Sequence, residues 1–359
     1  MKNYQKLKMI LSVLIFGLLS VAATPQEKEW TFLLFLNANN NLDYFGDINL
    51  KQMEQIGSSD KINIVVQWGS MSRQTVKRLL IKKSTNPNQI TSPVVEDIGK
   101  ADMGDYKELT KFLKWGHDKY PAKKYFVAIW NHGNGWYKSK QDQNMHINDI
   151  SYDDKTGNQI TTEQLGVAME EFSNYIGHKV DLYGSDACLM SMAEVAGEMS
   201  DSVSYFAGSQ EVEPGYGWPY NTFLEEWMKN PMASPEEVGK TLASEYYKAY
   251  SGGVYGVSSV TFSILNLNAF RNFEMAVTNL KDELMNLSQS DMKLALDKVK
   301  GTQSFTYPDY KDFGQFVDSV NADKIISEKI DSNFNKSLQD LVVMNKTSDT
   351  YRNAHGISI

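Results

Sequence analysis

The sequence predicts an α/β fold in which helices cover both faces of a mostly parallel central sheet. Three short apolar runs, WTFLLFL (residues 30–36), INIVVQW (62–68) and YFVAIW (125–130), are typical of strands buried on both faces. Segments with helical spacing of apolar residues lie between these runs, as expected for crossover helices. The third run stops at the polar turn NHGNG (131–135), which indicates a loop at the edge of the sheet.

The remaining elements follow from the same patterns, taken in chain order. Residues 75–81 alternate apolar and polar side chains and suit an edge strand, and Thr162 is the expected N-cap of the helix that follows a polar loop at 137–154. The predicted strands are residues 30–36, 62–68, 75–81, 125–130, 180–183, 204–209 and 260–265. The predicted helices are residues 42–56, 104–120, 162–175, 190–199, 235–250 and 269–287, with further helices up to about residue 344.

We expect three parts along the chain: a leader at residues 1–23, a core at 24–220, and a part at 221–359 that packs on the core as additional, largely helical structure. The leader has Lys2, Lys6 and Lys8 before an apolar run of 15 residues that ends in small side chains, which is typical of a signal peptide. The run is shorter than the 18 to 20 or so residues that span a bilayer, so a retained anchor is the weaker alternative. No later stretch is apolar enough to span a membrane, so the protein is predicted to be exported and secreted, periplasmic or attached to the cell surface.

Composition excludes several classes of protein. Of 359 residues, 42% are hydrophobic and 22% charged, which excludes a disordered chain. The formal charge of −8 argues against binding to nucleic acid, since such binding needs an excess of cations. A single cysteine, Cys188, excludes internal disulfides and metal sites made of several thiolates. The final residues, 356–359, look like the start of a strand, so we expect the sequence to be truncated at its end.

Two strand ends carry residues suited to nucleophilic catalysis. His132 follows the run YFVAIW, and Cys188 follows the run VDLY (180–183), so both are expected at the carboxyl edge of the sheet. A thiol has a pKa of about 8.5, so a nucleophilic cysteine needs an imidazole or a helix N-terminus nearby, and both are expected at Cys188. The backbone amides of Gly133 and Cys188 could stabilise an oxyanion. The alternatives are a histidine in an ordinary turn, an inert buried thiol, and His355 in place of His132.

At this point the sequence resembles the clostripain-like cysteine peptidases, relatives of caspases, legumains and gingipains. The resemblance lies in five blocks that occur in the family's order: NANNNL (37–42), WNHGNGW (130–136), YDD (152–154), DACLM (186–190), and GSQE (208–211) with PGYGW (214–218). It implies a caspase-like three-layer α/β/α sandwich with extra C-terminal helices. It also implies that His132 is the base and that Cys188 is the nucleophile that forms a thioester acyl-enzyme.

The resemblance further implies cleavage after Arg or Lys, which requires a carboxylate in the pocket for that side chain. Asp186 has the family position of this group, and Ser209, Glu211 and Glu213 are further candidates for substrate binding. The alternative for Asp186 is an N-cap on a helix that starts near Cys188, and the alternative for the two glutamates is an exposed rim.

Family members are commonly zymogens that cleave themselves between the histidine and cysteine blocks. Where a basic residue would be expected, before Tyr152, this chain has NDIS (148–151), so Lys140 is the weakly favoured processing site, with an uncut loop as the alternative. No cofactor is expected, and calcium is possible without a motif to support it. No phosphate loop, HExxH motif or GxSxG motif occurs. The alternative from another class is an inactive, exported caspase-like protein that binds peptides or partners.

Overall fold

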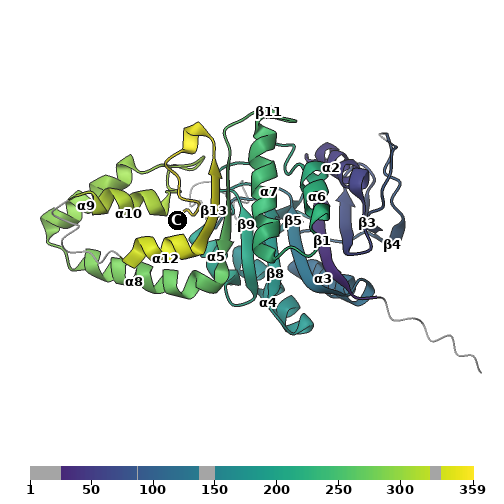
Figure 1. Ribbon diagram of the computed structural model, residues 1–359, viewed down its shortest axis with the longest axis horizontal. Helices are drawn as coiled ribbons and strands as arrows, with labels where there is room; N and C mark the ends of the chain where they lie inside the picture. The colour runs from purple at the N-terminus through teal and green to yellow at the C-terminus, as the bar shows by residue number, and fades with distance from the viewer. Residues whose placement is uncertain (1–25, 87, 137–149, 324–332) are drawn as a thin grey trace, which may run out of the picture.

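The computed structural model describes residues 26–359 with the exception of 87, 137–149 and 324–332. The described chain forms a nine-stranded sheet in the order β13-β12-β9-β8-β5-β1-β2-β3-β4 (Figure 1). The strands are β1 (Lys28–Ala38), β2 (Ile62–Ser70), β3 (Thr75–Leu80), β4 (Val94–Gly99), β5 (Ala122–Trp130), β8 (Val180–Asp186), β9 (Val203–Gly208), β12 (Thr261–Asn266) and β13 (Val342–Thr347).

The five central strands β2, β1, β5, β8 and β9 run parallel, and the two outer strands at each edge are antiparallel to their inner neighbours. The sheet is therefore mixed overall, with the parallel part at its centre. Parallel neighbours end at the same edge of the sheet, so the loops after β1, β5 and β8 meet there.

Helices cover both faces of the sheet and make it the middle of three layers. The helices on one face are α3 (Tyr106–Lys119), α4 (Thr162–Ile176) and α5 (Ala193–Met199), and those on the other are α2 (Asp43–Ile56), α6 (Tyr220–Lys229) and α7 (Pro235–Tyr250). Alternate residues of β1 point to opposite faces, so Leu33 and Phe35 join one core while Phe32 and Leu34 join the other. The predicted α/β sandwich is confirmed.

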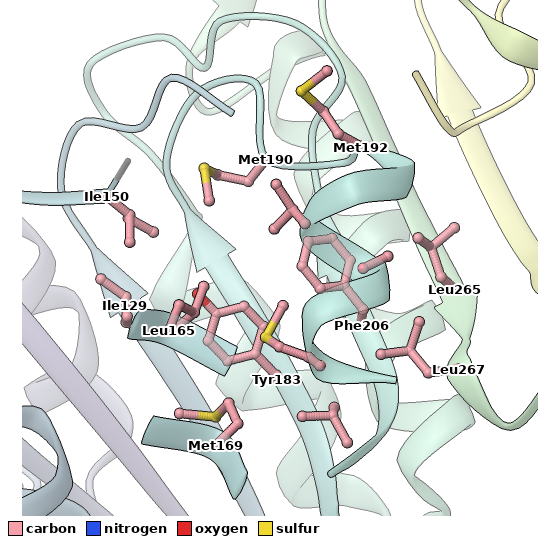
Figure 2. Packing of buried hydrophobic residues seen from close by; sticks show 14 of the residues in the cluster. Ile129, Ile150, Leu165, Met169, Tyr183, Met190, Met192, Phe206, Leu265 and Leu267 are labelled. Carbon is pink, nitrogen blue, oxygen red and sulfur yellow. The ribbon is translucent and has the colours of Figure 1, made fainter. Parts of the chain in front are cut away.

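The first core continues under the neighbouring strands toward the sheet edge where the loops meet. Figure 2 shows Tyr183 of β8 beside Phe206 of β9, with ring centroids 5.6 Å apart, and Met190 and Met192 above them. These side chains are fully buried. The segment that follows Cys188 is therefore held by an apolar interior as well as by its backbone.

The C-terminal helices extend one end of the molecule beyond β13 (Figure 1). They are α8 (Phe270–Met285), α9 (Gln289–Gly301), α10 (Phe313–Asn321) and α12 (Asn333–Leu341), and their aromatic side chains Phe273, Phe313 and Phe334 pack together. The minor elements are the hairpins β6 (Ile150–Asp153) with β7 (Asn158–Ile160) and β10 (Ser251–Gly253) with β11 (Gly256–Val257), and the 3₁₀ turns η1 (Leu267–Ala269) and η2 (Asp349–Tyr351). No described helix is both long enough and apolar enough to cross a membrane.

Several predicted boundaries were wrong. The strand expected at 75–81 does not lie at the edge, because the exposed strand β4 lies outside it. The N-cap of α4 is Thr161, whose side chain accepts a hydrogen bond from the Gln164 N–H. The helices expected up to residue 344 stop at Leu341, where the chain enters β13.

The helix expected from residue 190 begins only at Ala193. The backbone N–H groups of Leu189 and Ser191 instead donate to the carbonyl groups of Glu211 and Ser209, and Leu189 has a left-handed φ of 63°, so this segment is a turn rather than the first turn of a helix.

Candidate active site

The register of the sheet brings the two candidate catalytic residues to neighbouring positions. Trp130 at the end of β5 pairs with Asp186 at the end of β8. His132 and Cys188 each lie two residues further along, in the loops that follow these two strands, and adjacent strands in a sheet are about 4.8 Å apart. The Asn131 N–H also donates to the Asp186 carbonyl at 3.2 Å, so the two loops leave the sheet side by side.

A cavity of about 220 Å³ opens at this edge of the sheet. It is lined by the ends of β5 and β8 and the residues that follow them, by Leu42 from the loop after β1, and by residues 212–215 and 217 of the turn-rich segment. Among its lining residues are His132, Asp186, Cys188 and Glu213. The structure thus brings together four of the residues that the sequence singled out.

His132 is half-buried at the wall of this cavity. Its Nε2 lies 2.7 Å from Oδ1 of Asn41, and the ring of Tyr152 stands edge-on to the imidazole with centroids 6.3 Å apart. Burial lowers the pKa of His132, and the Asp154 carboxylate partly opposes that effect. At neutral pH the imidazole is therefore uncharged and able to accept a proton.

Cys188 is half-buried, and its thiol lies 3.9 Å from the Glu213 carbonyl oxygen that it faces. Burial raises the pKa of Cys188, and the carboxylates of Asp186 and Glu211 raise it further. The prediction that a helix N-terminus lies at Cys188 and activates its thiol was wrong, because α5 begins five residues later at Ala193. At neutral pH the sulfur is therefore a neutral thiol, and the imidazole that lines the same cavity is also neutral.

Gly133 occupies a position where a side chain does not fit. A Cβ atom there would lie 2.6 Å from the Cys188 carbonyl oxygen and 2.9 Å from the Ala187 Cβ. The backbone of the histidine loop therefore packs directly on the backbone of the cysteine loop, and glycine at this position permits that approach.

Asp186 and Glu213 place two carboxyl groups at the cavity. Asp186 accepts hydrogen bonds from the Trp218 N–H at 3.2 Å and the Tyr220 hydroxyl at 2.8 Å. It ends β8, so its alternative interpretation as an N-cap was wrong. The Asp186 and Glu213 carboxyl groups lie against each other: hydrogen bonding between them raises the pKa of Glu213 and lowers that of Asp186, and the Trp218 side chain also contacts Glu213. The expectation that Glu213 lies on an exposed rim was also wrong, since the residue is only 7% exposed.

Burial raises the pKa of both carboxyl groups, to about 7 for Asp186, whose hydrogen bonds partly oppose the effect. The charge of Asp186 adds to the rise at Glu213. Neither group forms an ion pair with a Lys, Arg or His among the residues that the structure covers. An uncompensated pair of buried carboxyl groups suits a ligand that brings a positive charge.

The structure places Ser209 and Glu211 away from the cavity lining. Ser209 is fully buried, and its hydroxyl donates to the Glu211 carbonyl at 2.8 Å. The Glu211 carboxylate is buried, not on an exposed rim, and it accepts hydrogen bonds from the Tyr351 hydroxyl at 2.8 Å and the Thr306 N–H at 3.2 Å. Both side chains therefore hold the loop that carries Glu213 rather than face a substrate.

His355, the rival candidate for the base, lies in the C-terminal part. Its Nδ1 and Nε2 each lie 2.9 Å from a carboxylate oxygen, of Asp312 and Asp318 respectively, and these contacts raise its pKa. Lys140 and residues 1–23 lie outside the described residues. Within the described ranges, no group of three or more His, Cys, Asp or Glu side chains is arranged to hold a metal ion.

Asn41 is the residue at this site that sequence reasoning missed. It lies in the block NANNNL that carries part of the family resemblance, but the pattern gave no sign that its side chain reaches an imidazole 91 residues away. A run of asparagines next to a strand end was the only available signal.

Comparisons with known proteins found relatives of the chain by sequence and by fold. A sequence profile described as the Clostripain family matches residues 34–356. Clostripain of Hathewaya histolytica is 27% identical over 292 residues, which cover 70% of this chain and 53% of that protein, so the chain spans about half the length of this curated relative.

Two solved structures share the fold. A secreted C11 cysteine protease from Bacteroides thetaiotaomicron, in complex with an irreversible peptide inhibitor, superposes with a TM-score of 0.72 at 17% identity, over 92% of each chain. An inactive zymogen C11 protease from Parabacteroides distasonis superposes with a TM-score of 0.70 at 19% identity, over 93% of this chain and 92% of that one.

Proposed function

Because the chain belongs to the clostripain family, we propose that it is an exported cysteine endopeptidase that hydrolyses peptide bonds after Arg or Lys. The observation that carries the proposal is a single cavity lined by a histidine, a cysteine and two buried carboxyl groups. Its substrates are peptides or proteins with a basic residue before the scissile bond.

In the proposed reaction, His132 takes the thiol proton of Cys188 as the sulfur attacks the peptide carbonyl carbon. The neutral states of the imidazole and the thiol favour this general-base route over a preformed ion pair. The backbone amides of Gly133 and Cys188 are the proposed donors to the oxyanion. His132 then protonates the leaving amine, which departs and leaves a thioester. Water, deprotonated by His132, hydrolyses the thioester and releases the carboxylic acid and the thiol.

Asp186 and Glu213 are the proposed determinants of specificity. A guanidinium or ammonium group in the cavity would compensate carboxyl groups that have no cationic partner among the described residues. The two remaining candidates, Ser209 and Glu211, support the proposal indirectly, because they hold the backbone that leads into Glu213.

Product mapping on a peptide library tests activity and specificity together. We expect the purified protein to generate new carboxyl termini at Arg and Lys, Cys188→Ala to generate none, and His132→Ala to be strongly impaired. Cleavage without a basic preference would contradict the proposed pocket. Absence of cleavage by the mature protein would contradict the proposed activity.

The raised pKa of Cys188 is also what an inactive peptide-binding relative would show, so this alternative is tested directly. An Arg-containing peptide with a thiol-reactive group should label Cys188 of an enzyme quickly, and the His132→Ala variant slowly. Equally slow labelling of both proteins would favour the binding module.

We also propose self-processing at Lys140, after export. The C11 protease from Parabacteroides distasonis, which has the same fold, is described as an inactive zymogen, and this supports an activation step in the present chain. Intact mass should show a cut after Lys140 in active protein, and an uncut chain in Cys188→Ala and Lys140→Ala. Full activity of a single uncut wild-type chain would rule processing out.

Removal of the leader and independence of metal ions complete the proposal. Sequencing the N-terminus of protein recovered outside the cytoplasm should start near residue 23 or 24. Activity should survive chelation by EDTA without recovery on adding calcium; a loss reversed by calcium would contradict a cofactor-free enzyme.

A further inference from the structure

Among the described residues, the imidazole of His132 has one hydrogen-bond partner, and the chemistry of that partner restricts the protonation of the ring. Its Nε2 lies 2.7 Å from the amide oxygen of Asn41. A carbonyl oxygen only accepts hydrogen bonds, so Nε2 must carry the proton that is donated to it. In the neutral ring this leaves the lone pair on Nδ1, which becomes the atom that accepts a proton.

Asn41 is held by its neighbours in the loop after β1. Asn39 donates from its side chain to the Asp153 carboxylate at 2.8 Å, and Asn40 donates to the Tyr152 carbonyl at 2.9 Å. Asn40 also accepts the Leu42 N–H at 2.9 Å. Asn39 and Asn40 are buried, whereas Asn41 is exposed and directs its amide to the histidine. Two asparagines therefore fix the backbone from which the third one reaches.

Several charged and titratable groups surround the imidazole, so a neutral partner such as the Asn41 amide keeps the pKa of His132 from rising. Asp154 acts on His132 across the site, and Asp186, Glu213 and Cys188 line the same cavity. A further carboxylate in contact with the ring would favour the imidazolium, which cannot accept a proton. An amide oxygen orients the ring without adding negative charge.

We propose that Asn41 is a positioning residue that holds His132 in the Nε2–H tautomer, so that Nδ1 is free to take the proton of Cys188. This assignment rests on the proposed function for the proton transfer, but the hydrogen bond and the tautomer do not depend on activity. Asn41 touches neither substrate nor sulfur in this role, and acts only through the imidazole.

The test compares the full-length wild type with Asn41→Ala, which removes the acceptor, and Asn41→Asp, which keeps it but adds a charge. The exposed Asn88, at the far edge of the sheet beside β4, supplies the matched control Asn88→Ala. The first readout is the ring ¹⁵N NMR signal of His132, assigned with His132→Ala. The second is the pH profile of kcat/KM, and the third is the thermal unfolding temperature.

We expect the wild type to show the Nε2–H tautomer and Asn41→Ala to show a mixture, with kcat lower by about 10- to 100-fold and KM little changed. Asn41→Asp should raise the pKa of His132 by roughly 1–3 units and move the acid limb of the pH profile up by the same amount. A merely structural role would lower the unfolding temperature without moving the tautomer or the acid limb. Asn88→Ala should leave all three readouts unchanged.

The inference is overturned if Asn41→Ala keeps both the wild-type tautomer and the wild-type kcat. Failure of the proposed function gives a different pattern. A wild type that cleaves no peptide, yet shows a tautomer that is lost in Asn41→Ala, would remove the peptidase proposal and leave the positioning role in place.

Discussion

Replacing Asp186 by Asn should remove the preference for Arg while preserving the reactive thiol. Asp186 is 4% exposed and is held by the Trp218 N–H and the Tyr220 hydroxyl. Asparagine has nearly the same shape and keeps one oxygen for these donors, so the main change is the loss of a charge. Glu213→Gln is the second variant, because it removes the other carboxyl group of the cavity while keeping nearly the same shape.

The expected magnitude follows from the burial of the proposed ion pair. Removing one partner of a buried, hydrogen-bonded charge pair costs about 2–5 kcal/mol. Since 1.4 kcal/mol corresponds to a factor of ten, kcat/KM for an Arg substrate should fall by about 30- to 4,000-fold. The remaining carboxyl group at Glu213 keeps part of the attraction, which favours the lower half of this range.

The assay uses two fluorogenic peptides that differ only in Arg or citrulline before the scissile bond. Citrulline has the shape of arginine without its charge, so the wild type should strongly prefer Arg, and Asp186→Asn should nearly abolish the difference. A half-buried acid outside the cavity, Glu194, whose pKa burial raises to about 7, supplies the control Glu194→Gln, which should keep the preference.

Alkylation of Cys188 by a small neutral reagent provides the internal control. The Asp186 carboxylate raises the pKa of that thiol, so Asp186→Asn should react at least as fast as the wild type at pH 7. An equal loss on the Arg and citrulline peptides, or an unchanged preference for Arg, would falsify the assignment of Asp186 to the specificity pocket.

Three further predictions concern stability and geometry. The folded protein retains a proton on Asp186 up to about pH 7, whereas the ordinary aspartate pKa is 3.8, so the wild type loses stability as the pH rises from about 4 to 7. Asp186→Asn does not titrate, so its unfolding temperature relative to the wild type should increase from pH 4 to pH 8. A constant difference between the two unfolding temperatures would contradict the raised pKa. Tyr351→Phe removes a hydrogen bond to Glu211 and should lower the free energy of unfolding, measured by chemical denaturation, by about 1.5–3 kcal/mol. It should also lower kcat/KM, because Glu211 holds the loop that carries Glu213. Loss of stability with unchanged kcat/KM would show that this loop does not need the contact. Gly217 has a positive φ, and Gly217→Ala places a Cβ 2.6 Å from an Asp186 oxygen, so this variant should impair cleavage after Arg. Gly157 also has a positive φ, but a Cβ added there has no atom within 4 Å. Gly157→Ala should therefore cost only the roughly 1–2 kcal/mol of backbone strain in stability and leave kcat/KM unchanged.

Much of the fold could be predicted because its central strands are buried on both faces. WTFLLFL, INIVVQW and YFVAIW are continuous apolar runs that few other structures accommodate, and all three form central strands. β4 was missed because an exposed edge strand has no apolar pattern to reveal it. β13 was missed because its six residues are only half-buried and directly follow a helix.

The direction of each side chain at the site was harder to predict. Glu211 and Glu213 lie two residues apart in the same turn and were equivalent in sequence. In the structure, the Tyr351 hydroxyl, 140 residues later, donates to the Glu211 carboxylate, whereas Glu213 lines the cavity. The non-helical turn after Cys188 was unexpected for a similar reason, since its backbone partners lie on a later segment, at Ser209 and Glu211.

By its local pattern alone, the chain determined which segments become buried strands, and therefore which residues emerge at their carboxyl ends, because apolar runs and polar turns act within a few residues. Tertiary structure decided which of those residues meet. The pairing of β5 with β8 set His132 beside Cys188, and the loop after β1 brought Asn41 to the imidazole. Such contacts depend on strand register and on partners remote in sequence, and no local pattern encodes them.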